Sequence, residues 1–130
     1  MKSYTDIEQS KKLAEILPIE SADCFWDYDE MQGFHRISWF EDGFNKHSQL
    51  LFNENNVCAW SLSALLDVLK SKIYYEKKFY YLNIEKDGTW WWIEYIERYG
   101  EANPIETSST EELIDACYEM ILKLKELNLL

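Results

Sequence analysis

Few side chains of this 130-residue chain have the types and spacing that catalysis or metal binding requires. His35 and His47 lie twelve residues apart, with Glu41 and Asp42 between them. Metal sites commonly use spacings such as HxH, HxxxH or CxxC, and the sequence contains none of these. We therefore interpret the histidines as one strand residue and one turn residue, and we expect no metal, no cofactor, no catalytic residues and no enzymatic activity.

The three cysteines, Cys24, Cys58 and Cys117, are odd in number, scattered, and surrounded by apolar neighbours. This pattern is typical of buried free thiols in a reducing compartment. Nucleophilic catalysis would need a serine or cysteine beside a histidine base, and no GxSxG motif is present. A small hydrolytic or metal enzyme built on His35, Cys58 and nearby acids is kept as a third hypothesis.

Carboxylates are the most numerous chemical groups, because the chain has 24 acidic and 13 basic residues. Paired acids can act in general acid/base catalysis or hold a hard cation, but a strongly acidic chain brings such pairs together by chance. We interpret them as solvated surface. They lie in the first half (Asp27, Asp29, Glu30, Glu41, Asp42) and around an aromatic segment in the second half (Glu85, Glu94, Glu97, Glu101).

Composition narrows the class of protein. The net charge of −11 disfavours nucleic acid and anionic membranes as ligands, and it favours basic or neutral partners. Hydrophobic residues make up 47% of the chain and aromatic residues 16%, so residues 1–130 should fold as a single domain. The N-terminus lacks the apolar stretch of a signal peptide, and no apolar run approaches the length of a membrane span. We expect a cytoplasmic protein.

The central element is a β-hairpin predicted over Phe79 to Glu97, FYYLNIEKDGTWWWIEYIE. Asp87-Gly88 is a strong signal for a two-residue type I′ turn, which would place Ile84 opposite Trp91 and Asn83 opposite Trp92. Alternation then assigns one face to the core, with residues Tyr80, Leu82, Ile84, Trp91, Ile93 and Tyr95. The opposite face carries Tyr81, Asn83, Glu85, Trp90, Trp92 and Glu94.

Other elements follow from caps and periodicity. The first helix should begin at a Thr5/Glu8 capping box and end at Leu17, and an irregular link over residues 19–32 should follow it. Alternation then predicts a strand over Gly33–Phe40 and a second strand over Gln49–Asn53. A helix capped by Ser61 should run to about Ser71, with Lys70, Lys72, Lys77 and Lys78 complementing its dipole. A Ser109/Glu112 capping box should start a final helix that ends near Leu127. The predicted fold is α+β, in the order α-β-β-α-β-β-α, with helices on one face of an antiparallel sheet of about four strands.

The second hairpin face supplies the leading functional hypothesis. Exposed aromatic side chains beside hydrogen-bonding groups are typical of protein–protein contact surfaces. We predict a protein-interaction module whose binding residues are Tyr81, Asn83, Glu85, Trp90, Trp92 and Glu94. Its partner would be an unknown protein or a second copy in a homodimer, with neither nucleic acid nor membrane involved. The alternative is an acidic nucleic-acid mimic that inhibits a DNA-binding protein.

Two stretches carry a resemblance: CAWSLSALLDVLK at Cys58 to Lys70 and ELIDACYEMILKLKELNLL at Glu112 to Leu130. With the strands between them, they resemble small uncharacterised proteins of gut-anaerobe bacteria and of their phages and mobile elements. The resemblance covers about the last 75 residues of the chain and consists of helix-core patterns without a catalytic signature. It implies a phage-associated protein or another structural-genomics protein of unknown function, and it assigns no functional residues.

Overall fold

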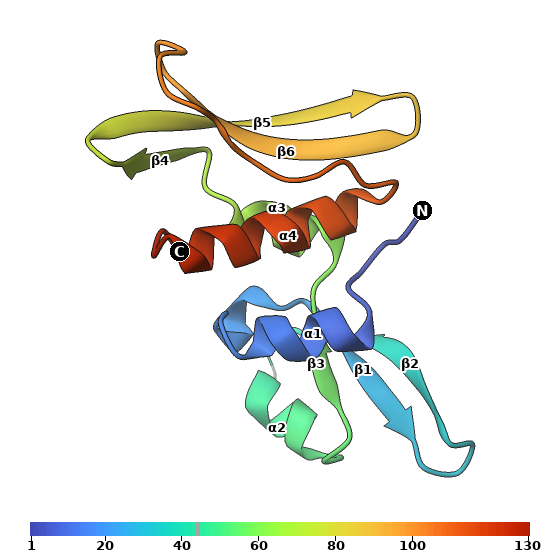
Figure 1. Cartoon of the computed structure of the whole chain (residues 1–130). Coiled ribbons are helices and arrows are strands. Elements are labelled where there is room, and N and C mark those ends of the chain that lie inside the picture. The colour runs from blue at the N-terminus through green and yellow to red at the C-terminus, as the bar shows by residue number, and fades with distance from the viewer. Residues whose placement is uncertain (44) are drawn as a thin grey trace. The chain divides into compact units, whose positions relative to one another are not determined.

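The computed structural model describes residues 1–43 and 45–130, and it confirms the α+β class (Figure 1). The chain divides into two compact units. One comprises Ser3–Ala64, and the other comprises Met1–Lys2 together with Leu65–Leu130. We call them the N-terminal unit and the C-terminal unit, and each has its own antiparallel sheet.

The N-terminal unit contains a three-stranded sheet in the order β2-β1-β3. Phe25 in the central strand lies opposite Ser38 on one side and Cys58 on the other. The buried residues Leu13, Cys24, Ala59 and Trp60 belong to its core. Its elements are α1 (Ile7–Ala14), a 3-10 turn η1 (Ile19–Ser21), β1 (Cys24–Asp29), β2 (Phe34–Trp39), α2 (Lys46–Leu51) and β3 (Val57–Ala59).

Several predictions for this unit were wrong. The segment predicted as an irregular link contains strand β1, whose far end is fixed by Asp29 Oδ1 accepting from the backbone N–H groups of Met31 and Gln32. Residues predicted as a second strand at Gln49–Asn53 instead overlap helix α2. The Asn45 side chain caps that helix by accepting from the Ser48 N–H, so His47, which was predicted to be a turn residue, lies in the first turn of a helix.

Helix α1 starts one residue later than predicted. Its capping box pairs Asp6 with Gln9, and not Thr5 with Glu8. Thr5 is fully buried, and its hydroxyl group makes other hydrogen bonds: Oγ1 lies 2.7 Å from Ser10 Oγ and accepts from the Trp60 N–H at 3.1 Å. Thr5 therefore ties the start of α1 to the end of β3.

The C-terminal unit contains a four-stranded sheet in the order β4-β5-β6-β7, with α4 packed against one face of it. The helix contributes Ile114, Cys117, Met120 and Ile121 to the core, and all four are fully buried. The remaining elements are α3 (Leu62–Val68), whose first three residues belong to the N-terminal unit, and β4 (Lys72–Tyr75), β5 (Lys78–Asp87), β6 (Trp90–Glu97), β7 (Ile105–Glu106) and α4 (Leu113–Glu126).

Both predicted helices of the second half form, with different ends. Ser61 Oγ accepts from the Ala64 N–H, which confirms it as the cap of α3, but this helix ends at Val68. Of the lysines predicted at its C-terminus, Lys70 lies between α3 and β4, whereas the others belong to the next hairpin, with Lys72 on β4 and Lys78 on β5. The β-propensity of Ile73, Tyr74 and Tyr75 explains the strand between them.

The final helix ends at Glu126, close to the predicted Leu127, but its predicted capping box is absent. Glu112 occupies the cap position without a side-chain capping bond. Its carboxylate instead accepts from the Lys2 backbone N–H at 2.7 Å.

The β5–β6 hairpin forms with a different turn. The connection is Gly88-Thr89, with Asp87 opposite Trp90 and Ile84 opposite Ile93. Gly88 has a φ of +62° while Thr89 is not among the residues with positive φ, as in a type II′ turn with glycine at its first central position. The turn therefore lies one residue further along the chain than predicted. Each residue of β5 pairs with a β6 residue two positions later than predicted, so every side chain keeps its predicted face.

Candidate binding face

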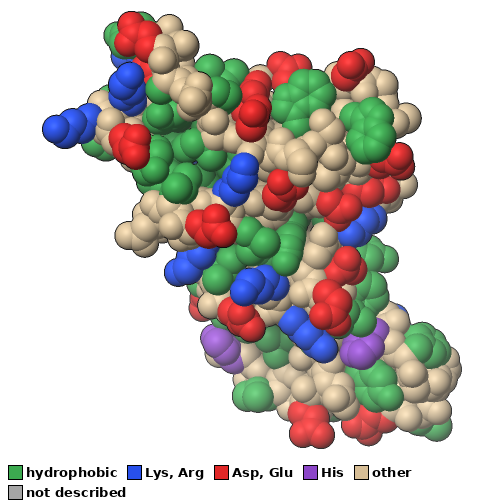
Figure 2. Space-filling view, in the orientation of Figure 1, with side chains coloured by type: hydrophobic (Ala, Val, Ile, Leu, Met, Phe, Trp, Pro, Cys, Tyr) green, Lys and Arg blue, Asp and Glu red, His purple; other side chains and the backbone are tan. Residues whose placement is uncertain are grey.

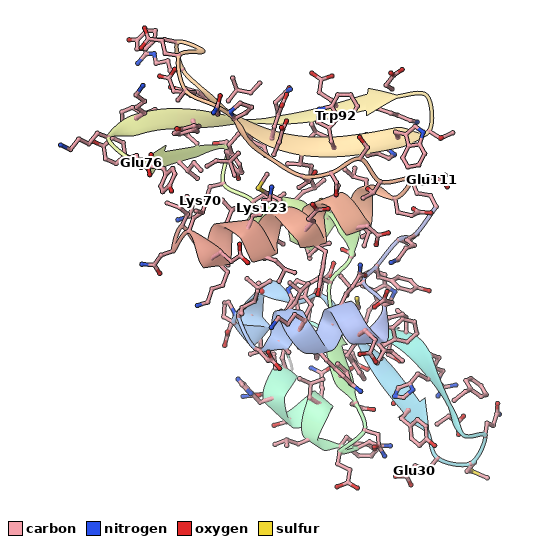
Figure 3. The ribbon with its side chains drawn as sticks, in the orientation of Figure 1. Glu30, Lys70, Glu76, Trp92, Glu111 and Lys123 are labelled. Carbon is pink, nitrogen blue, oxygen red and sulfur yellow. The ribbon has the colours of Figure 1, made fainter. Side chains whose placement is uncertain are left out.

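The six predicted binding residues lie together on the face of β5 and β6 that points away from α4. The buried residues Tyr80, Ile93 and Tyr95 lie on the opposite, helix-covered face. We define the outer face as the side-chain layer of Tyr81 and Trp92 and of the residues that share their side of strands β4 to β7. Trp90 is 47% exposed and Tyr81 is 39% exposed there. Figure 3 labels Trp92 on β6 within this sheet.

Asn83 organises the centre of this face. It lies opposite Glu94, and its Nδ2 donates to Glu94 Oε1 and to Glu85 Oε1, each at 2.9 Å. One amide group therefore holds two carboxylates from neighbouring strands. The next cross-strand pair is Glu85 with Trp92, followed by Asp87 with Trp90 at the turn end. Each of these two indole rings is therefore paired across the strands with a carboxylate.

Strand β4 extends the outer face beyond the predicted set. Tyr74 lies opposite Phe79, with ring centroids 5.0 Å apart, and Lys72 lies opposite Tyr81 with its Nζ 4.7 Å from the Phe79 ring centroid. Ile96 lies opposite Tyr81 on β6 and is 38% exposed. The sequence prediction missed Tyr74 because it assigned the lysines around it to the end of a helix, and it placed Phe79 in the hairpin without including it among the binding residues. The sequence signal that could have identified this strand is the presence of aromatic residues on both sides of a short turn.

The charge on this face is mainly negative. Within the described strands β4 to β7, its carboxylates are Glu85, Asp87, Glu94 and Glu106, and its cation is Lys72. Figure 2 shows hydrophobic side chains next to acidic ones over this sheet. A nucleic-acid mimic should present paired rows of carboxylates, whereas here aromatic side chains and an amide interrupt them.

The groups considered for catalysis are not brought together. His35 lies opposite Tyr28 on the edge strand β2, and its Nε2 lies 3.3 Å from the Asn55 carbonyl oxygen. Cys58 is on β3, on the other side of β1, and it lies opposite Phe25, three residues from Tyr28 along β1. At ordinary strand spacing, His35 and Cys58 are therefore roughly 14 Å apart. Within the described residues, no group of three or more His, Cys, Asp or Glu side chains could hold a metal ion.

The cysteines are free and buried, as predicted. Burial raises the pKa of Cys24 and of Cys117 to about 12, and that of Cys58 to about 11. For Cys24, the neighbouring Asp23 carboxylate raises the pKa further. Since the thiolate is the reactive form, a raised pKa disfavours these thiols as nucleophiles.

Comparisons of this chain with protein-family models, with curated proteins and with solved structures found no match. In the part of the chain that the structure describes, no helix combines the length and apolar character needed to span a bilayer.

Proposed function

We propose that this chain is a non-enzymatic protein-interaction module that binds a basic segment of a partner protein through the outer face of its β5–β6 hairpin. The observation that carries the proposal is the pairing of two indole rings, one exposed and one partly exposed, with carboxylates: Trp90 lies opposite Asp87 and Trp92 lies opposite Glu85.

The side-chain chemistry supports a binding role. Tryptophan and tyrosine are enriched among residues that dominate binding energy, because a large rigid ring buries much area at little entropic cost. The hydrogen bonds from Asn83 hold Glu85 and Glu94 in place before a partner arrives. A partner would therefore meet carboxylates whose ordering cost is already reduced.

Electrostatics supports a basic partner. The chain carries a net charge of −11, and the outer face adds a local excess of carboxylates over lysine. Such a field speeds association with cationic segments, and added salt weakens it. Arginine fits this surface especially well, because its guanidinium group can stack on an indole ring and donate to a carboxylate in the same contact. The three buried thiols favour a reducing compartment, and we place the module in the cytoplasm.

The experiment is affinity capture with the tagged chain, using the double variant Trp90→Ala/Trp92→Ala. We expect loss of a specific basic protein that the unchanged chain retains, and weaker capture as salt increases. Circular dichroism should show that the variant is folded, because Trp90 is exposed and Trp92 is partly exposed.

The matched control is Trp39→Ala. Trp39 is 57% exposed, but it lies on β2 in the N-terminal unit, so this variant tests whether any exposed indole ring is sufficient. It should retain the partner. Sedimentation of the purified chain tests the second-copy alternative. If the unchanged chain forms a dimer that the double variant abolishes, the outer face serves self-association and not a basic partner. If the double variant captures the partner as well as the unchanged chain does, the proposal is refuted.

A further inference from the structure

Strand β2 forms one edge of the N-terminal sheet, with β1 as its neighbour on the inner side (Figure 1). The Phe40 N–H donates to the Asp23 carbonyl oxygen at 3.2 Å, in continuation of the β1–β2 register. Hydrogen-bonded pairs alternate with non-bonded pairs in an antiparallel ladder. His35, Ile37 and Trp39 therefore belong to non-bonded pairs and direct their backbone N–H and C=O groups away from β1. We call these backbone groups the open edge.

The contacts of Tyr28 give independent evidence for this alternation. Tyr28 lies opposite His35, yet its N–H donates to Asn56 Oδ1 at 3.0 Å and its carbonyl oxygen accepts from Asn53 Nδ2 at 3.1 Å. Asn56 directly precedes β3, so the backbone groups of Tyr28 point to the β3 side of β1. Among the described residues, no hydrogen-bond partner is found for the groups of the open edge.

The other sheet edges among the described strands are less suited to pairing. Strand β3 has three residues and packs against α1, and β7 has two residues. Strand β4 carries the exposed Lys72, and an edge lysine is a common protection against strand pairing. Strand β2 has six residues and contains neither lysine nor proline. Beyond it, the Glu41 N–H is bound by Gln49 Oε1 at 3.1 Å, so the open edge ends at Trp39.

A second copy of β2 fits the open edge in one antiparallel register. Residues that direct their backbone groups outward must lie opposite residues that do the same. With Ile37 opposite Ile37 of the second copy, His35 lies opposite Trp39, and every group of the open edge gains a partner. Arg36 then lies opposite Ser38, so no two like charges of β2 are directly opposite each other.

The neighbouring registers are disfavoured. A shift of two residues in one direction places Arg36 opposite Arg36 of the second copy, and like charges directly opposite each other destabilise a sheet. A shift of two residues in the other direction requires the Glu41 N–H, which Gln49 already binds. The sequence of β2 therefore favours a single pairing of two identical strands.

Exposed aromatic side chains at both ends of β2 support the same register. Phe34 is 47% exposed and Trp39 is 57% exposed. In the paired strands, Phe34 lies opposite Phe40 of the second copy and Trp39 lies opposite His35, so each exposed ring meets another ring. Such cross-strand aromatic pairs stabilise antiparallel strands, and the removal of ring surface from water adds to this.

We propose that the chain forms a homodimer in which β2 pairs antiparallel with β2 of a second copy, so that two three-stranded sheets become one continuous sheet. The interface contains none of the outer-face residues and is independent of the function proposed above. Each copy carries a net charge of −11, so repulsion between the copies opposes pairing. Added salt screens this repulsion and should strengthen the dimer, whereas it should weaken binding of a basic partner.

Sedimentation velocity of the purified chain over a range of concentrations tests the proposal with the variant Ile37→Pro. The Ile37 N–H points outward, so proline removes a hydrogen bond from each copy to the other and none between β1 and β2. We expect the unchanged chain to form a dimer that strengthens in high salt. The variant should have a dissociation constant at least about ten-fold larger, and circular dichroism should show that it is folded.

Lys72→Pro is the matched control. The Leu82 N–H donates to the Ser71 carbonyl oxygen at 3.0 Å, so the Lys72 N–H points away from β5, as the Ile37 N–H points away from β1. This variant should leave the dimer intact, and so should the double variant of the outer face. The two proposals can therefore fail separately.

Cysteine cross-linking tests the register without proline. Ile37→Cys places the two new residues opposite each other with Cα atoms about 5.5 Å apart, within reach of a disulfide. Met31→Cys is the control, because Met31 is 97% exposed but lies opposite Gly43 in this register and not opposite its own copy. Mild oxidation should link Ile37→Cys into a dimer faster than Met31→Cys, and the native cysteines are buried in both variants.

Three results would each overturn the proposal. The first is a chain that stays monomeric at every concentration and salt level. The second is a dimer that Lys72→Pro or the outer-face double variant disrupts as strongly as Ile37→Pro does. The third is cross-linking of Ile37→Cys that is no faster than that of Met31→Cys.

Discussion

Asn83 on β5 lies opposite Glu94 on β6, and its amide group donates to the Glu94 carboxylate at 2.9 Å while also holding Glu85. Replacing the amide by a carboxylate would place three negative charges in contact. We expect Asn83→Asp to lower the free energy of unfolding by about 1 kcal/mol at neutral pH, because like charges opposite each other destabilise a sheet. Urea titration measures this loss.

Added salt should recover part of the stability lost in Asn83→Asp, because it screens partly exposed charges. Asn83→Ser is the control, since it removes the amide without adding a charge. A loss equal in the two variants and independent of salt would show that repulsion is not the cause.

The β4–β5 turn is a place where stability can be gained. Glu76 and Lys77 have φ values of +49° and +67°, which both central residues of a type I′ turn require and which ordinary side chains disfavour (Figure 3 labels Glu76). The double change Glu76→Asn/Lys77→Gly should raise the free energy of unfolding by about 1 kcal/mol, because Asn and Gly adopt this backbone more easily. Thermal unfolding followed by circular dichroism measures the shift.

Lys86→Gly is the matched control for that turn. Lys86 lies in a regular part of β5 opposite Trp91, where glycine has no conformational advantage and the contact of Lys86 Nζ with the indole ring, 4.8 Å from its centroid, would be lost. It should destabilise the chain. Stabilisation by both sets of changes would contradict the assignment of strain to the turn.

The outer face could be predicted from sequence because alternation is insensitive to a one-residue error in the turn. The Asp-Gly signal placed the turn one residue too early, yet Trp90 and Trp92 stayed on one side and Ile93 on the other. Burial of the predicted core was less complete. Tyr80, Ile93 and Tyr95 are buried, whereas Leu82, Ile84 and Trp91 are only partly so.

The missed elements share a physical cause, since short segments of mixed pattern are decided by tertiary contacts. Strand β1 carries Asp27 and Asp29 among its aromatic residues, and it becomes recognisable only when paired between β2 and β3. A cleft of the N-terminal unit that Asp27 on β1 and Gln49 on α2 both line was not predictable, because the sequence predicts a strand where this helix forms. Single-domain folding of residues 1–130 stays a prediction.

Thr5 supplies a further test of stability, because its buried hydroxyl group makes two polar contacts. Thr5→Val keeps the shape of the side chain but removes the acceptor of the Trp60 N–H and the partner of Ser10 Oγ. We expect the free energy of unfolding to fall by about 1–3 kcal/mol, since buried polar groups would lose their partners. Thr5→Ser keeps the hydroxyl group and should lose less. Equal losses in chemical denaturation would show that the methyl group, and not the hydrogen bonds, is what matters.

The acid side of the stability profile should depend on Glu97. Its Oε2 accepts from the backbone N–H groups of Glu101 at 2.9 Å and Tyr99 at 3.0 Å, and the positive charge of Lys78 also favours the ionised form. The Glu101 hydrogen bond is the largest of the influences that hold the pKa of this carboxyl group below its ordinary value, and burial opposes them only in part.

A carboxyl group whose pKa is lower in the folded chain than in the unfolded chain stabilises the fold above the unfolded pKa, which is about 4.3 for glutamate. That stabilisation is lost as the pH falls through the lower, folded pKa. The urea midpoint of the unchanged chain should therefore fall as the pH decreases below about 4.3. Glu97→Gln should lower the midpoint at neutral pH and flatten this decrease, whereas Glu111→Gln, at an exposed position, should leave the decrease in place. Identical profiles for Glu97→Gln and the unchanged chain would show that other carboxylates control the acid transition.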